Sequence, residues 1–126
     1  MIGMRTAAVV CLLAATGCGG SHAPTDGGGV GTAVGPPQQQ TFTIHGTDRQ
    51  QFSPQTVNAR VGTLTLTLQN GGVPHDLTFK APELPGIGVV SGSATKSTTL
   101  KLTSPGSYVF VCTIHPGMAG KLVVER

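Results

Sequence analysis

Hydrophobic and polar residues alternate strictly over residues 63–68, which read TLTLTL. Successive side chains of a β-strand point to opposite faces, so this order places the leucines on one face and the threonines on the other. Shorter alternations of the same kind recur along the chain after residue 40: Phe42/Ile44, Leu77/Phe79, Leu100/Leu102, Tyr108/Phe110/Cys112 and Leu122/Val124. The pattern predicts about seven half-buried strands and shows no helical period.

Turn-forming sequences separate these segments: Asn70-Gly71-Gly72, Pro85-Gly86, Ser104-Pro105-Gly106 and Pro116-Gly117. The chain of 126 residues, with 19 Gly, nine Pro and no Trp, is long enough for one small domain. Short strands joined by turns predict an all-β domain over residues 41–126, folded as a Greek-key β-sandwich.

Residues 1–17 differ from the rest of the chain. They carry Arg5, no acidic residue and an apolar run over residues 7–15, which is too short to span a bilayer and is typical of a secretory signal. The following Ala15-Thr16-Gly17-Cys18 resembles a bacterial lipobox, although such a box usually has Leu where Ala15 stands. The resemblance implies that Cys18 is lipidated and begins the mature chain. The alternative is ordinary cleavage nearby with Cys18 left free.

Residues 19–40 contain seven Gly and three Pro with no hydrophobic period. This composition predicts that Cys18 and the rest of the segment 18–40 form a flexible linker, which would attach the domain to a membrane on the periplasmic or other extracytoplasmic face of the cell envelope. Only 10% of residues are charged, and the net charge is +3. That charge density is far below that of a nucleic-acid-binding protein, so we expect no nucleic-acid partner.

Cys112 is the one thiol left after removal of the signal and lipidation of Cys18. A lone thiol in an oxidising compartment is expected to be buried, catalytic or bound to a metal. It begins the spacing C-x-x-H-x-x-M with His115 and Met118, and Pro116-Gly117 suits a turn that brings these side chains together. Thiolate, imidazole and thioether are soft to borderline ligands, and such a set selects copper over magnesium or calcium.

A trigonal copper site needs a second imidazole, and the candidates are His45 and His75. His45 has the opposite parity to Phe42 and Ile44, which predicts a solvent-facing strand residue. His75 follows a turn and opens a strand, a position where sandwiches place binding sites. The pattern therefore favours His75.

Residues 41–126 resemble a cupredoxin, the fold of the small blue-copper proteins plastocyanin and amicyanin. The resemblance is carried by Phe52-Ser53-Pro54 before a strand, by the upstream His75 and by Gly106-x-Tyr108-x-Phe110-x-Cys112 leading into the ligand loop. It implies one type 1 copper ion with His75, Cys112 and His115 as equatorial ligands and Met118 as the weak axial ligand.

Asp76 departs from the family pattern, because many members have Asn directly after the first histidine ligand. We predict that Asp76 accepts a hydrogen bond from the Thr113 hydroxyl and so still braces the ligand loop. A carboxylate at this position is also expected to lower the reduction potential by favouring Cu(II).

The resemblance implies a one-electron carrier that exchanges electrons with redox proteins of the cell envelope through the exposed edge of His115. An uncharged docking patch is predicted around that edge, from Pro74, Pro116 and Ala119 with their neighbours Val73, Ile87 and Ile114. An exported protein for copper storage or delivery is the alternative function. The sequence has no His-Cys-His run or second domain for a multicopper enzyme, so we expect a monomeric, non-enzymatic protein.

Overall fold

Ten β-strands and one short 3-10 turn make up residues 29–126, which are the residues described by the structure, a computed structural model. The strands are β1 (Val30–Thr32), β2 (Gln40–Gly46), β3 (Phe52–Ser53), β4 (Thr56–Arg60), β5 (Gly62–Asn70), β6 (Gly72–Phe79), β7 (Ile87–Gly92), β8 (Thr95–Leu102), β9 (Gly106–Val111) and β10 (Ala119–Glu125). The turn η1 (Pro37–Gln39) precedes β2.

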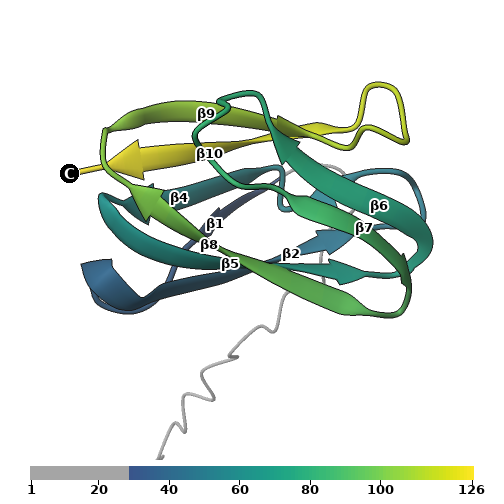
Figure 1. The fold of residues 1–126 in the computed structure, drawn as a ribbon. Coiled ribbons are helices and arrows are strands. Elements are labelled where there is room, and N and C mark those ends of the chain that lie inside the picture. Colours follow the sequence, from purple (N-terminus) through teal and green to yellow (C-terminus); the bar gives the residue numbers. More distant parts are fainter. Residues whose placement is uncertain (1–28) are drawn as a thin grey trace, which may run out of the picture.

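Two sheets pack face to face (Figure 1). One has the strand order β1-β4-β10-β9-β6-β7 and the other the order β3-β2-β5-β8. Most neighbouring strands are antiparallel, but β2 runs parallel to β5, and β4 runs parallel to both β1 and β10. The predicted two-sheet β-sandwich is confirmed.

The alternating segments form the core as predicted. Leu64, Leu66 and Leu68 of β5 are buried between the sheets, while the threonines between them are partly exposed. Phe110 of β9 contacts Phe52 and Phe79 edge to face, at ring-centroid distances of 5.0 and 5.6 Å. These apolar contacts join the two sheets and stabilise the end of the sandwich from which the ligand loop leaves.

The strand count exceeds the prediction because some strands lack a period of two. In β7 the buried residues are Ile87 and Val90, three positions apart. The register between β6 and β7 shifts twice, on either side of His75. A strand with such irregular pairing shows no alternation in its sequence.

The predicted linker is wrong for residues 29–40, which belong to the folded domain. β1 pairs in parallel with β4, Val30 opposite Thr56, and an isolated bridge joins Val34 to Thr41. Gly31 lies so close to Phe42 that a Cβ atom there would be 2.3 Å from the ring. Backbone pairing and one close glycine contact hold this segment, and neither produces a hydrophobic period.

The predicted signal segment and Cys18 fall within residues 1–28 and so lie outside the described residues. Within the described part of the chain, no helix is long and apolar enough to span a membrane.

Candidate metal centre

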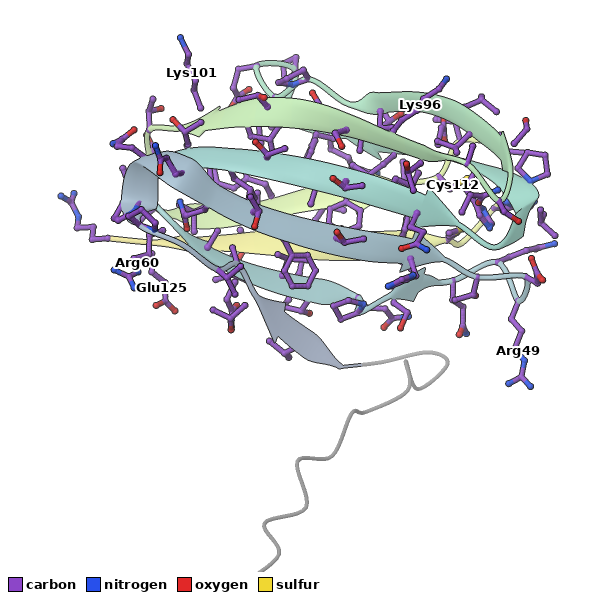
Figure 2. The ribbon with its side chains drawn as sticks, turned by 90° about the horizontal axis from the view of Figure 1, so that it is seen from below. Arg49, Arg60, Lys96, Lys101, Cys112 and Glu125 are labelled. Atoms are coloured by element: carbon purple, nitrogen blue, oxygen red, sulfur yellow. The ribbon has the colours of Figure 1, made fainter. Side chains whose placement is uncertain are left out.

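Three ligand side chains converge at one end of the sandwich. His75 lies in β6, Cys112 directly follows β9, and His115 lies in the loop that joins β9 to β10. The Cys112 Sγ atom is 3.9 Å from His75 Nδ1 and 3.7 Å from His115 Nδ1. One ligand atom from each of the three residues lies within 4.8 Å of the other two. Figure 2 places Cys112 at this end, far from Lys101, Arg60 and Glu125 at the other.

The loop over residues 112–118 closes on itself through backbone hydrogen bonds. Met118 N–H donates to the His115 carbonyl at 3.2 Å, and Cys112 N–H donates to the Met118 carbonyl at 3.0 Å. Gly117 adopts φ +81°, a conformation that glycine tolerates and that a type II turn requires at its third residue. The predicted turn at Pro116-Gly117 is confirmed. It buries Met118 and leaves the His115 side chain partly exposed.

His75 is fully buried, and the backbone sets the orientation of its ring. Its Nε2 atom is 2.8 Å from the Thr47 carbonyl oxygen, which can only accept, so Nε2 carries the proton. In the neutral imidazole the other ring nitrogen, Nδ1, then offers its lone pair, and it faces the Cys112 sulfur. This is the tautomer that can donate a lone pair to a metal ion.

The spacing of the three donors fits a bound metal ion. With metal–sulfur and metal–nitrogen bonds of about 2.3 and 2.0 Å, a trigonal centre separates the sulfur from each nitrogen by about 3.7 Å. The two observed separations, 3.9 and 3.7 Å, match that value. Among the described residues no carboxylate joins this group of three, and one thiolate with two imidazoles is the donor set of blue-copper sites.

Asp76 braces the ligand loop, as predicted. Its Oδ1 accepts the Thr113 backbone N–H at 2.6 Å, and its Oδ2 accepts the Thr113 hydroxyl at 2.5 Å. Burial raises the pKa of Asp76, but the hydrogen bonds from Thr113 outweigh this effect and hold the pKa below its usual value. The side chain is therefore a carboxylate at neutral pH, adjacent to two of the ligands.

Other residues that support His75 were not predicted. Gly71 N–H donates to the Gly46 carbonyl at 3.0 Å, and Val73 N–H donates to Asp48 Oδ1 at 3.2 Å. Together with the bond from His75 to Thr47, these contacts join residues 46–48 to the segment that carries His75. Backbone acceptors such as the Thr47 carbonyl leave no signature in residue type. His45, the alternative candidate, is not in the ligand group.

Most of the predicted docking residues are exposed near His115. Pro74, Pro116, Ala119 and Ile114 are exposed, and Val73 is half-buried. Ile87 is only 4% exposed and belongs to the core, so its assignment to the patch is wrong.

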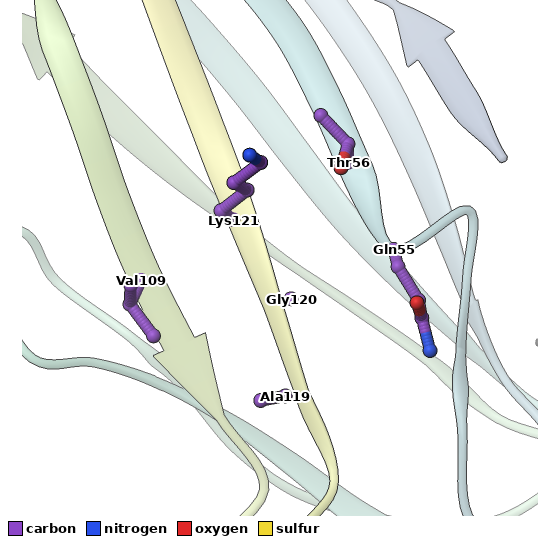
Figure 3. Close-up of a pocket in the computed structure, with 6 residues that line it drawn as sticks. All are labelled: Gln55, Thr56, Val109, Ala119, Gly120 and Lys121. Atoms are coloured by element: carbon purple, nitrogen blue, oxygen red, sulfur yellow. The ribbon is translucent and has the colours of Figure 1, made fainter. Parts of the chain in front are cut away.

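Ala119 also lines a shallow hollow of about 310 Å³ on the outer face of β4, β10 and β9 (Figure 3). The other lining residues are Gln55, Thr56, Val109, Gly120 and Lys121. Ala119 therefore lies between the ligand loop and this hollow, whose lining includes the positively charged Lys121.

A family model described as a cupredoxin-like domain matches residues 8–124. The chain belongs to the cupredoxin-like family. It is 32% identical over 81 residues to amicyanin-alpha of Methylorubrum extorquens and 29% identical over 86 residues to chloroplastic plastocyanin of Chlamydomonas reinhardtii. These matches cover 61% and 60% of this chain, and 66% and 59% of the relatives.

Solved structures agree with this family. The oxidised P94A mutant of amicyanin matches with a TM-score of 0.56 and 26% identity, over 68% of this chain and 82% of the mutant. The cofactor expected for a cupredoxin, one type 1 copper ion, fits both the family and the donor set found here.

Proposed function

We propose that this cupredoxin is a one-electron carrier that holds a single type 1 copper ion between His75, Cys112 and His115, with Met118 as a weak axial ligand. The observation that carries the proposal is that one sulfur atom and two imidazole nitrogens lie within 4.8 Å of one another at one end of the sandwich. Bound there, copper supplies a one-electron couple between Cu(II) and Cu(I).

The chain holds its ligands in place without needing the metal to organise them. His75 is fixed by the Thr47 carbonyl, and Cys112 by its backbone bond to Met118. Thr113 is tied to Asp76 by two hydrogen bonds. A ligand set anchored at each strand end moves little when the charge of the centre changes, which favours rapid electron exchange.

Electrons would enter and leave at His115, because its side chain is partly exposed while His75, Cys112 and Met118 are buried. The exposed, uncharged residues Pro74 and Pro116 directly adjoin the ligands His75 and His115 in the sequence, and Ala119 follows Met118. A small, mostly apolar patch suits the brief complexes that redox proteins form with their partners.

The proposal includes attachment to a membrane of the cell envelope through a lipid on Cys18, following cleavage of the signal over residues 1–17. Its support is the sequence pattern of that segment. Replacement Cys18→Ala is expected to abolish incorporation of radiolabelled fatty acid in the producing bacterium. Persistent labelling would contradict the lipid anchor.

The visible spectrum tests the copper centre. The copper-loaded protein is expected to bind one copper ion per chain and to absorb intensely in the red, through charge transfer from the Cys112 thiolate to Cu(II). Cys112→Ser should remove this band, whereas His45→Ala should leave it unchanged. A colourless protein loaded with Cu(II) would contradict the proposal.

Copper storage or delivery is distinguished by the fate of the metal. An electron carrier keeps its copper through repeated cycles of oxidation and reduction. A delivery protein would lose Cu(I) to a competing chelator soon after reduction. Copper content measured before and after several redox cycles in the presence of a Cu(I) chelator decides between them.

A further inference from the structure

The described chain begins at the same end of the sandwich as the metal centre. β1, β4 and β10 are parallel and in register, with Val30 opposite Thr56 and Thr56 opposite Lys121. The Gly29 carbonyl, directly before Val30, accepts a hydrogen bond from Thr56 N–H. On the other side of β4, β10 begins at Ala119, directly after the ligand loop and two residues before Lys121. Strands lie about 4.8 Å apart, so the two strand spacings from β1 to β10 place Gly29 about 10 Å to the side of the start of β10.

The opposite end of the sandwich lies far from this point. β10 runs for seven residues from Ala119 to Glu125, which at about 3.3 Å per residue is about 23 Å. Figure 1 shows the C-terminus at the end of the sandwich opposite the β9–β10 loop. Lys101 is paired with Thr63 near the start of β5, and Figure 2 places it at that far end as well.

The connection to the proposed lipid is also shorter than the sequence predicted. Because residues 29–40 belong to the domain, only residues 19–28 separate Cys18 from Gly29. Eleven Cα-to-Cα steps span about 40 Å at full extension.

We infer that this cupredoxin is tethered by its copper-binding end, so that the Cys112–Met118 loop stays close to the membrane surface and its redox partner is a membrane-bound protein. The inference rests on the proposed lipid at Cys18. A tether attached beside the ligand loop keeps that loop within reach of proteins in the same membrane, at a high effective concentration. It places the far end of the sandwich, with Lys101, about 23 Å farther from the point of attachment.

The sequence contains no tryptophan, so a single introduced tryptophan can report how far each end of the domain lies from the membrane. We would introduce one tryptophan at either end, Arg49→Trp near the metal centre or Lys101→Trp at the far end. Figure 2 labels both side chains, and each substitution replaces one exposed positive residue. The lipidated, reduced, copper-loaded full chain is then bound to vesicles that carry a dansyl group on a fraction of the lipid headgroups.

Energy transfer from tryptophan to the dansyl lipids should be at least about twofold stronger for Arg49→Trp, because transfer falls steeply over the length of the sandwich. Insertion of ten Gly/Ser residues after Gly28 should reduce this difference. Equal transfer from both positions in vesicle-bound protein would overturn the orientation. Failure of the chain to bind vesicles would overturn the anchor and the inference together. The visible spectrum of the same sample after reoxidation to Cu(II) reports on the copper centre independently.

The partner class is tested by moving the anchor. Reduced protein is bound to vesicles whose membrane also contains a ferrocenium lipid. The ferrocenium group accepts one electron from the copper centre and becomes ferrocene. Reoxidation should be roughly tenfold faster for the natural tether than for a Cys18→Ala chain lipidated after Arg126. Water-soluble ferrocenium should oxidise the two at equal rates. Equal rates with the lipid probe would contradict a partner confined to the membrane.

Discussion

At the scale of single residues, the backbone around β2 decides how His75 faces the sulfur. The Thr47 carbonyl holds the proton on Nε2, and Gly46 lies directly against the imidazole ring. Neither contact involves a side chain that could be recognised as a ligand. The metal centre therefore depends on positions whose importance is visible only once the strands are placed.

Gly46→Ala tests this dependence. A Cβ atom at residue 46 would lie 2.5 Å from Cδ2 of His75, far inside the 3.5–4.0 Å at which carbon atoms attract. The ring must shift, and we expect copper affinity to fall by about tenfold or more, with a change in the visible band. Copper titration followed by absorbance measures both effects.

Gly88→Ala is the matched control, because a Cβ atom there would meet nothing within 4 Å. This variant should bind copper like the parent. If Gly46→Ala also behaved like the parent, the contact between Gly46 and His75 would have no role in the site.

Asp76 carries a second prediction at this scale. Removing one buried negative charge several ångströms from the metal, at an effective dielectric constant of about 20–40, changes the relative stability of the two oxidation states by roughly 1–2 kcal/mol. We therefore expect Asp76→Asn to raise the reduction potential by about 40–90 mV. Protein-film voltammetry gives the potential directly. An unchanged or lower potential would mean that this carboxylate does not favour Cu(II).

At the scale of elements, the strands that the sequence predicts are those with one buried and one exposed face. The alternation in β5 predicts Leu64, Leu66 and Leu68 in the core, and the structure buries all three. The sequence pattern does not predict β7, because its pairing with β6 is irregular. It does not predict β1 either, because that strand is held by backbone hydrogen bonds and by the close contact of Gly31 with Phe42.

The ligand loop was predictable for a different reason. Its three side chains and its turn lie within the seven residues 112–118, so local spacing alone brings them together. His75 comes from a distant strand, and sequence parity could only favour it over His45. Its orientation by Thr47 depends on the contact between residues 46–48 and β6, which no local pattern encodes.

The contribution of β1 can be measured by truncation. A chain that begins at Thr41, the predicted domain boundary, loses the pairing of β1 with β4 and the bridge between Val34 and Thr41. At about 0.5–1.5 kcal/mol for each backbone hydrogen bond, losing several of them should lower the free energy of unfolding by about 3 kcal/mol. Urea denaturation compares this chain with one that begins at Gly29. Equal stabilities would show that β1 does not contribute to the fold.

At the scale of the whole molecule, the two ends of the sandwich carry different residues. The ligand loop and the first described residue share one end, and Arg60, Lys101 and Glu125 lie at the other (Figure 2). Near His115 the exposed residues Pro74, Pro116 and Ala119 are uncharged, although the chain carries a net charge of +3. An uncharged area around the point of electron access is the surface expected to contact a partner.

Ala119→Glu tests whether this area is a docking surface. Ala119 is exposed, follows the buried Met118, and lines the hollow of Figure 3, so a glutamate there would place a charge beside the ligand loop without filling the core. A desolvated charge at the contact should slow electron exchange with the natural partner by roughly tenfold, or about 1.4 kcal/mol, while the colour and copper content stay unchanged.

Thr99→Glu, in the other sheet, adds the same charge at an exposed position and should exchange electrons like the parent. Stopped-flow rates measured beside visible spectra compare the three proteins. Equal rates for both variants would exclude Ala119 from docking, and equal slowing by both would attribute the effect to net charge rather than to the patch.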